Sequence, residues 1–256
     1  MQLADARCVA RPVARQEPPG LLATVRALLV LLIATDLAFI VLHVVYVETT
    51  LLRGRPFSLE ADNGLPEAFQ YVKQFWIALC MLALFRRTRQ VVYAGWTLVF
   101  AFLLLDDAFQ LHESFGQWLG SQYSLPVAFG LRPDDIGELL FASLIGGVTV
   151  LLIGFGFWRG DADARTVSRD TALLVVILAG LGVGVDIVHV ITYFKAPLLG
   201  QLLLILEDGG EMLVVSAIAA YTFNVLIHQG RAPVDLWAYV CSRIKPASKA
   251  AKGLMS

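Results

Sequence analysis

Six apolar segments dominate the sequence, each long enough to cross a bilayer as a helix. A transmembrane helix needs about 20 consecutive, mainly apolar residues. The six segments cover 21–47, 67–85, 91–112, 136–158, 171–194 and 200–228. Only 16% of the residues are charged, whereas soluble domains average about 25%. The sequence therefore predicts an all-α, polytopic membrane protein with a bundle of six transmembrane helices.

The rest of the chain leaves little room for another folded unit. We expect an N-terminal segment over 1–20, the transmembrane domain over 21–228 and a tail over 229–256. Within the tail, Val234–Lys245 combines helically spaced apolar residues with basic ones, which predicts an amphipathic helix lying in the membrane interface. The first apolar segment exceeds the roughly 7–15 apolar residues of a signal peptide, so we expect it to be retained as a helix.

Basic residues are distributed unequally between the loops. Fourteen lysines and arginines lie before the first segment, after the second, after the fourth and after the sixth, whereas four lie in the alternate loops. Because short loops rich in lysine and arginine stay in the cytoplasm, both termini are expected to be cytoplasmic. The sequence thus predicts a multi-pass protein of the cell membrane.

Polar and ionisable side chains lie mainly in the half of each segment that this orientation places outside. They are Asp36 and His43 in the first segment, Glu67, Gln70, Lys73 and Gln74 in the second, Asp106, Asp107, Gln110, His112 and Glu113 in the third, Asp186 and His189 in the fifth, and Glu207, Asp208 and Glu211 in the sixth. The inner halves are almost entirely apolar. These positions predict a shared polar site beneath the outer surface.

Helical spacing indicates which of these side chains share a face. Residues three, four or seven apart lie on the same side of a helix. This rule pairs Asp36 with His43, Asp186 with His189, and Glu207 with Glu211. Along the third segment, Asp106, Gln110 and Glu113 share a face from which Asp107 and His112 diverge.

The energy of burying charge requires that these acids be neutralised. An ionised carboxylate costs roughly 2.5–3.5 kcal/mol at the middle of a bilayer, and seven acids lie within the segments in addition to Glu67 and Glu138 at segment starts. Without neutralisation, their combined cost would rival or exceed a typical domain stability of about 5–15 kcal/mol. Lys73 is the basic side chain expected at that depth, so the remaining acids require bound cations, protons or a water-filled cavity.

Histidines beside the acids favour a metal ion. Neutral imidazole and carboxylate together suit zinc, iron or manganese as a divalent cofactor. The candidate ligands are Asp36, His43, Asp106, His112, Glu113, Asp186, His189, Glu207 and Glu211. Asp107 or Asp208 is a candidate general base that takes a proton from an attacking water. This pattern favours a metal-dependent enzyme, of the hydrolase kind, acting on lipid or another apolar molecule.

Two other functions fit the same residues. Carboxylates at depth also form ion pathways, which would make the protein a cation or proton transporter or channel. Ser216, Thr222 and Asn224 in the inner half of the sixth segment are the polar residues that favour such a path. The third interpretation is a non-catalytic scaffold whose polar core fixes helix packing. Nothing in the sequence indicates a nucleic-acid partner.

Other acids and several glycines have simpler structural interpretations. Asp134, Asp135 and Glu138 follow a proline at a predicted helix start, where acids cap free amides and complement the helix dipole. The glycines of Leu178–Asp186 either allow close helix approach or relax the backbone before the acid. The glycine pair of Glu207–Glu211 similarly leaves room for a neighbouring helix or a substrate chain.

Overall fold

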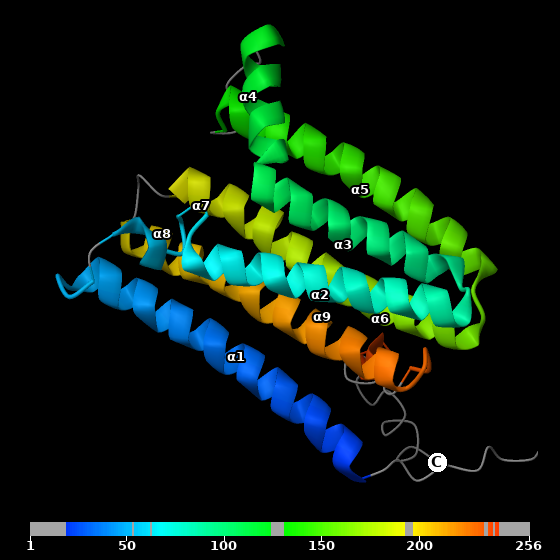
Figure 1. Ribbon diagram of the computed structural model, residues 1–256. Coiled ribbons are helices and arrows are strands. Elements are labelled where there is room, and N and C mark those ends of the chain that lie inside the picture. The colour runs from blue at the N-terminus through cyan, green and yellow to red at the C-terminus, as the bar shows by residue number, and fades with distance from the viewer. Residues whose placement is uncertain are drawn as a thin grey trace, which may run out of the picture.

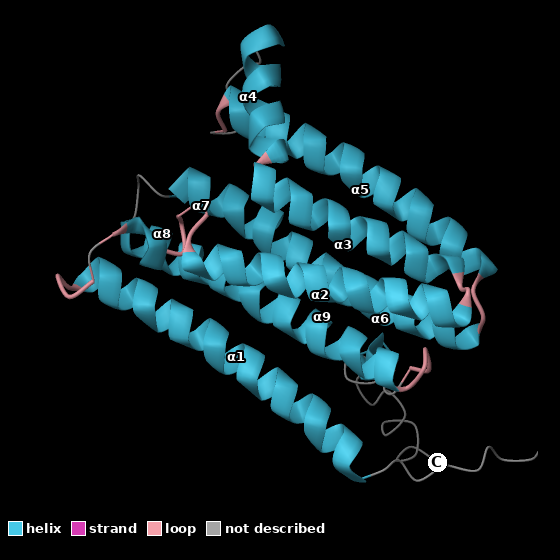
Figure 2. Cartoon of the chain, viewed as in Figure 1, coloured by secondary structure: helices cyan, strands magenta, loops and turns pink. Residues whose placement is uncertain are grey.

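The computed structural model describes residues 19–52, 54–61, 63–123, 131–192, 197–232, 235–237 and 239–240. These residues form helices and loops (Figure 2), which confirms the all-α prediction. Most of the predicted interfacial helix Val234–Lys245 lies outside the described residues, as does most of the N-terminal segment.

Five helical runs are long and apolar enough to cross a membrane. They are α1 (Pro19–Glu48), α2 (Leu65–Thr88), α3 (Val91–Phe109), α5 (Pro133–Arg159) and the run Ala162–His189, which contains α6 (Ala162–Ala179), the π-helical segment η2 (Gly180–Val185) and most of α7 (Asp186–Thr192). These runs lie side by side in the bundle (Figure 1). Five of the six predicted segments therefore form helices of membrane-spanning length.

The sixth predicted segment is also helical, but a π-helical segment that contains two acids interrupts its regular α-helix. It consists of α8 (Pro197–Leu204), the π-helical segment η3 (Ile205–Gly209) and α9 (Gly210–Ile227), which follow one another without a gap. The helix α9 packs against α1, α2 and α6, so it lies at the centre of the bundle (Figure 1). A short 3₁₀ turn, η1 (Arg55–Phe57), lies in the loop between α1 and α2.

The third predicted segment, 91–112, is not one continuous helix. The helix α3 ends at Phe109, and Gln110 adopts the left-handed conformation with φ of 52°. The chain then begins α4 (Leu111–Tyr123), which runs in a new direction across one end of the bundle (Figure 1).

An acid at the end of α3 stabilises this change of direction. Asp106 Oδ1 accepts the backbone N–H of His112 at 3.0 Å, so it caps one of the free amides at the start of α4. The expectation that Asp106 and Glu113 share one face, from which Asp107 and His112 diverge, was therefore wrong. It assumed a continuous helix, and the turn places all four side chains around one cavity.

An apolar core between α2, α3 and α9 holds the bundle together. Its innermost members are Ile77, Met81, Leu84, Val92, Trp96, Phe100, Val215 and Ile218, each at most 2% exposed. Large apolar side chains also face outward, among them Leu31 on α1, Leu151 on α5 and Val176 on α6, at 66, 75 and 68% exposed. Apolar surface on both sides of the helices suits a bundle surrounded by lipid.

Glycines bring neighbouring helices into close backbone contact. A Cβ atom on Gly137 of α5 would lie 2.7 Å from the Cα of Gly116 on α4. A Cβ atom on Gly156 would lie equally close, at 2.7 Å, to the Cα of Val92 on α3. Small residues at such contacts let membrane helices pack tightly, and here they fix α4 and α3 against α5.

One ion pair is buried entirely inside the bundle. Lys73 Nζ on α2 lies 2.8 Å from Asp36 Oδ1 on α1, and both side chains are 0% exposed. The same ammonium donates to the Met212 carbonyl at 2.9 Å and to Ser216 Oγ at 3.2 Å on α9. Ser216 in turn donates to Asp36 Oδ2. This network satisfies the lysine and links α1 to α2 and α9.

The glycine contact predicts a difference between two identical substitutions on α5. Gly137→Ala should lower the unfolding temperature, because overpacking costs about 1–3 kcal/mol. Gly146→Ala is the matched control, since its Cβ would meet nothing within 4 Å, and alanine should stabilise a helix there by about 0.5–1 kcal/mol. Thermal unfolding in detergent compares the two. Equal effects would contradict the close α4–α5 contact.

The buried ion pair predicts a strong dependence of stability on Lys73. Lys73→Met should destabilise the protein by about 3–5 kcal/mol, because it leaves the Asp36 carboxylate buried without a counter-charge. The double variant Lys73→Met with Asp36→Leu should recover most of this loss, since it removes both charges. Chemical or thermal unfolding in detergent measures both variants. A double variant as unstable as the single one would contradict this account.

Candidate functional site

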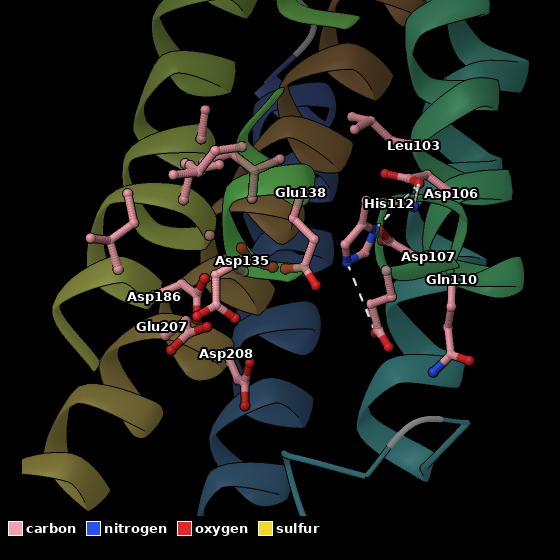
Figure 3. A pocket seen from close by; sticks show the side chains of 18 of the residues that line it. Leu103, Asp106, Asp107, Gln110, His112, Asp135, Glu138, Asp186, Glu207 and Asp208 are labelled. Carbon is pink, nitrogen blue, oxygen red and sulfur yellow. Dashed lines mark hydrogen bonds and ion pairs between the residues drawn. The ribbon is translucent and has the colours of Figure 1, made fainter. Parts of the chain in front are cut away.

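A strongly acidic cavity of about 740 Å³ lies at one end of the bundle. Its carboxylate side chains are Glu67, Asp106, Asp107, Glu113, Asp134, Asp135, Glu138, Asp186, Glu207, Asp208 and Glu211. Arg132 and His112 are the basic side chains among its described lining residues. Figure 3 shows acids from opposite walls facing the same space. Such an excess of one charge in a partly enclosed site creates a strong negative potential.

Most of the candidate residues from the sequence meet in this cavity. Asp106 and Asp107 come from the last turn of α3, and His112 and Glu113 come from the first turn of α4. The remaining members are Asp186 from α7, Glu207 and Asp208 from η3, and Glu211 from α9. His189 lies one helical turn beyond Asp186. The structure thus brings together the end of the third predicted segment with the fifth and sixth.

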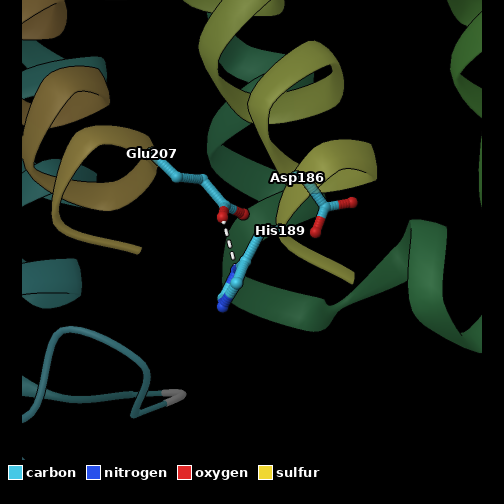
Figure 4. Close-up of side chains that lie close together, drawn as sticks. All are labelled: Asp186, His189 and Glu207. Atoms are coloured by element: carbon cyan, nitrogen blue, oxygen red, sulfur yellow. Dashed lines mark hydrogen bonds and ion pairs between the residues drawn. The ribbon is translucent and has the colours of Figure 1, made fainter. Parts of the chain in front are cut away.

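Three of these side chains are close enough to hold one metal ion. A carboxylate oxygen of Asp186, a ring nitrogen of His189 and a carboxylate oxygen of Glu207 all lie within 4.8 Å of one another. His189 Nδ1 is 2.9 Å from Glu207 Oε2 (Figure 4). The carboxylates of Asp186 and Glu207 thus lie close to each other, and two acids at such a distance need a shared proton or a cation between them.

The local backbone around this group is unusual on both helices. Asp186 directly follows the π-helical segment Gly180–Val185, and Glu207 lies within the π-helical segment Ile205–Gly209. Single π-helical turns inside α-helices occur frequently at functional sites. A Cβ atom on Gly182 would overlap the Glu211 carboxylate, so the absence of a side chain there makes room for this acid. Of the three glycines before Asp186, Gly182 is the one that a neighbouring side chain approaches, since a Cβ atom on Gly180 or Gly184 would meet nothing within 4 Å.

The glycine pair between the acids of η3 and α9 serves helix packing. A Cβ atom on Gly209 would lie 3.0 Å from the Ile40 side chain on α1. One on Gly210 would lie 3.1 Å from the Leu181 side chain on η2. These contacts bring the acidic stretch close to both neighbouring helices, as the interpretation of a glycine pair between helices expected.

The opposite wall of the cavity is formed by α2 and α3. Gln74 Nε2 donates to Asp107 Oδ2 at 2.6 Å, and the hydroxyl of Tyr71 donates to the Asp107 carbonyl at 3.2 Å. Gln70 Nε2 donates to Glu211 Oε2 at 3.4 Å. The Oε1 atom of Gln74 is buried and accepts no hydrogen bond within the described part of the chain. These contacts orient two of the acids and leave one amide acceptor unused.

His112 is a basic side chain within this acidic surrounding. Its Nδ1 atom lies 3.3 Å from Asp106 Oδ1, and its Nε2 atom lies 4.0 Å from Glu113 Oε1. The hydrogen bond with Asp106, together with the charges of Asp106, Glu113 and Glu138, outweighs the effect of burial and raises the pKa of His112 from 6.5 to about 9. At neutral pH His112 is therefore an imidazolium that offsets part of the negative charge.

Sequence reasoning assigned the acids at the start of α5 to the helix terminus alone. Asp135 does act there, because it accepts the Arg132 backbone N–H at 2.7 Å and forms an ion pair with the Arg132 side chain at 2.7 Å. Asp134, Asp135 and Glu138 also line the cavity, as does Glu67 of α2. The sequence signal that could have assigned them to the cavity was their position in the first two turns of helices that start at the same end of the bundle as the other acids.

Two candidate ligands lie apart from both the cavity and the three-residue group. Asp36 forms the buried ion pair with Lys73. His43 is 4% exposed, and its Nδ1 accepts the backbone N–H of Leu59 at 3.0 Å, which fastens the loop before α2 to α1. The structure does not bring either residue to the group formed by Asp186, His189 and Glu207.

Five long apolar helices around an acidic cavity define an integral, multi-pass membrane protein. Residues 25–225 match the family model described as a domain of unknown function (DUF8692), and the chain belongs to this family. The matched range contains every residue that lines the cavity. No curated protein matches the chain, and no solved structure matches it.

The raised pKa of His112 can be measured directly. In an NMR titration of the histidine ring signals, His112 should titrate near pH 9, and in Asp106→Asn its midpoint should fall toward 6.5. Asparagine still accepts the amide of His112, so the cap is preserved. Because the folded-state pKa is raised, the stabilisation is complete below pH 6.5 and disappears as the pH rises through about 9. A wild-type midpoint near 6.5 would contradict the contact.

Proposed function

We propose that this protein is a membrane-embedded, metal-dependent enzyme that acts on lipid or another apolar molecule. The observation that carries the proposal is the convergence of Asp186, His189 and Glu207, two of which, Asp186 and Glu207, line an acidic cavity. His189 and Glu207 are partly buried, with side chains 14 and 15% exposed. The group is therefore largely shielded from bulk water, and its two carboxylates border the cavity.

The chemistry of the three side chains favours a transition metal. One imidazole with two carboxylates suits zinc, iron or manganese better than calcium or magnesium, which prefer oxygen ligands alone. Three protein ligands with an open position are typical of catalytic zinc sites, whereas structural sites use four. A bound divalent metal would act as a Lewis acid and would lower the pKa of water in the site.

Two carboxylates are placed to act as the general base. Asp208 neighbours Glu207 along η3, and both point into the space that Asp186 faces (Figure 3). Asp107 lies on the opposite wall, where Gln74 holds its carboxylate through a hydrogen bond of 2.6 Å. Asp208 is the better candidate, because a general base must lie within hydrogen-bond reach of the attacking water. Asp106, His112, Glu113 and Glu211 complete the surrounding acidic wall.

The same proposal includes six membrane crossings, with the cavity on the outer side and both termini in the cytoplasm. The Gln90 side chain donates to Asp161 Oδ2 at 2.8 Å, which joins the α2–α3 and α5–α6 loops at the end opposite the cavity. These two loop regions carry most of the basic residues between the helices. Basic loops face the cytoplasm, so the acidic cavity would open toward the outer leaflet.

A second candidate function is a cation or proton transporter. It is favoured by the buried network of Lys73, Asp36 and Ser216, in which Lys73 is the chain neighbour of the lining residue Gln74. Beyond it, Thr222 and Asn224 on α9 are also buried. The fully buried Met81 and other large apolar side chains of the core lie at this level, and they favour a closed cavity over a through-path.

Elemental analysis of the purified protein tests the metal site. The wild type should contain stoichiometric zinc, iron or manganese, and Asp186→Asn and Glu207→Gln should lose it. Asp134→Asn is the matched control, because it makes the same change in the same cavity outside the three-residue group. Retention of metal in both ligand variants, or its absence from the wild type, would overturn the metal site.

Turnover is tested on the metal-loaded protein with a membrane lipid extract analysed by mass spectrometry. A product should form with the wild type and not with Asp186→Asn. Asp208→Asn should keep the metal but form the product about 100-fold more slowly, the effect of losing a general base. If no product forms and ion flux into liposomes depends on Asp186, the result would overturn the enzyme proposal and support the transporter.

A further inference from the structure

The acidic cavity continues into an apolar wall at membrane depth. Its lining includes Leu103 of α3, Leu139 of α5, and Val175 and Ala179 of α6. Val175 and Asp186 lie on the same helical run, so a rise of 1.5 Å per residue separates them by about 16 Å. The volume of about 740 Å³ is in the range of small-molecule sites. The cavity is thus polar at one end and apolar at the other, like an amphiphile.

The charge of the polar end restricts the headgroup that can enter. Eleven carboxylates line the cavity, with Arg132 and His112 as the basic lining residues. A divalent ion at Asp186 would reduce this excess of acids but would not remove it. Phosphate and carboxylate headgroups would be repelled by such a field, whereas a cation would be attracted.

The hydrogen-bonding groups point to the same kind of headgroup. Gln74 is 3% exposed and lines the cavity, and its Oε1 atom has no partner among the described residues. Together with the surrounding carboxylates, including Asp107 beside it, this atom gives the site a surplus of acceptors. A protonated primary amine offers three N–H donors and no acceptor. The buried ammonium of Lys73, held by a carboxylate, a carbonyl and a hydroxyl, shows that this bundle can bind such a group.

We infer that the substrate class is a single-chain amphiphile with a protonated amine headgroup. The amine would lie among Gln74, Asp107 and Glu211, and the alkyl chain would lie along the apolar wall that includes Leu103 and Val175. This inference names the substrate class of the site proposed above and so rests on that function. It excludes anionic phospholipids as the molecules that the cavity binds best.

Binding of matched probes to the purified protein in non-ionic detergent tests the inference by native mass spectrometry. Dodecylamine, dodecanol and dodecanoate share one alkyl chain and differ in headgroup charge. Dodecylamine should bind at a concentration about tenfold or more below the other two, as expected from electrostatic attraction. Equal binding of the three, or tighter binding of dodecanoate, would overturn the inference. Inorganic cations would then be the expected ligands of these acids.

Variants assign the binding to the two ends of the cavity. Asp107→Asn, and Glu138→Gln as a second variant, should weaken dodecylamine several-fold and leave dodecanol unchanged. Asp163→Asn is the control, because this exposed acid lies outside the cavity at the start of α6. Unchanged amine binding in both cavity variants would overturn the inference.

A second pair of variants tests the apolar wall. Ala179→Phe should weaken all three probes by filling the wall, whereas Ile177→Phe, on the exposed side of the same helix, should weaken none. Equal effects of the two would overturn the placement of the alkyl chain.

Metal content is measured on the same samples, which separates the two proposals. A preference for the amine in a protein that contains no metal would support the substrate class and overturn the metal-dependent function. Bound metal without any preference for the amine would support the function and overturn the substrate class.

Discussion

Burying many carboxylates in a medium that solvates ions poorly is the constraint on which this structure depends. Each ionised acid at membrane depth costs several kcal/mol unless a counter-charge, a proton or water accompanies it. The bundle meets this cost in two ways. Asp36 is neutralised by Lys73 in a fully enclosed ion pair, whereas eleven other acids gather around one cavity, where His112 and Arg132 offset part of their charge.

The same backbone features that close the bundle also shape the cavity. Asp106 caps α4 and pairs with His112, so one acid both turns the chain and brings a cation to the site. Gly182 leaves space for Glu211 across the two π-helical segments. Because such residues act in packing and in the site at once, substitutions there should change stability and ligand binding together. Lys73 and Gln74 are neighbours on α2 but have different roles. Lys73 links α2 to α1 and α9, whereas Gln74 lines the cavity.

Much of the fold could be predicted from the sequence, because placing polar groups in a membrane costs free energy. This cost determines how long the apolar segments are and where polar residues lie along them. These rules located the helices and gathered Asp186, His189 and Glu207 on the correct end of the bundle. They did not show that the chain turns at Gln110, since the turn is stabilised by a side-chain cap from Asp106 and contains neither a proline nor a glycine. Nor did they separate Asp36 from the other acids, because its pairing with Lys73 depends on how α1 and α2 face each other. Glu138 shows a third difficulty, since an acid near a helix start can serve both the terminus and a site.

The π-helical segment Gly180–Val185 has a consequence for how this family can vary in length. A π-helical turn holds one residue more than an α-helical turn, and each residue of an α-helix rotates the chain by about 100°. Removing a single residue from this segment would restore regular α-helix and swing Asp186 and His189 away from Glu207, while α6 kept its packing. The extra residue therefore sets the rotation of α7 relative to α6, and homologues that lack it should no longer bring Asp186 and His189 to Glu207, although they retain the bundle.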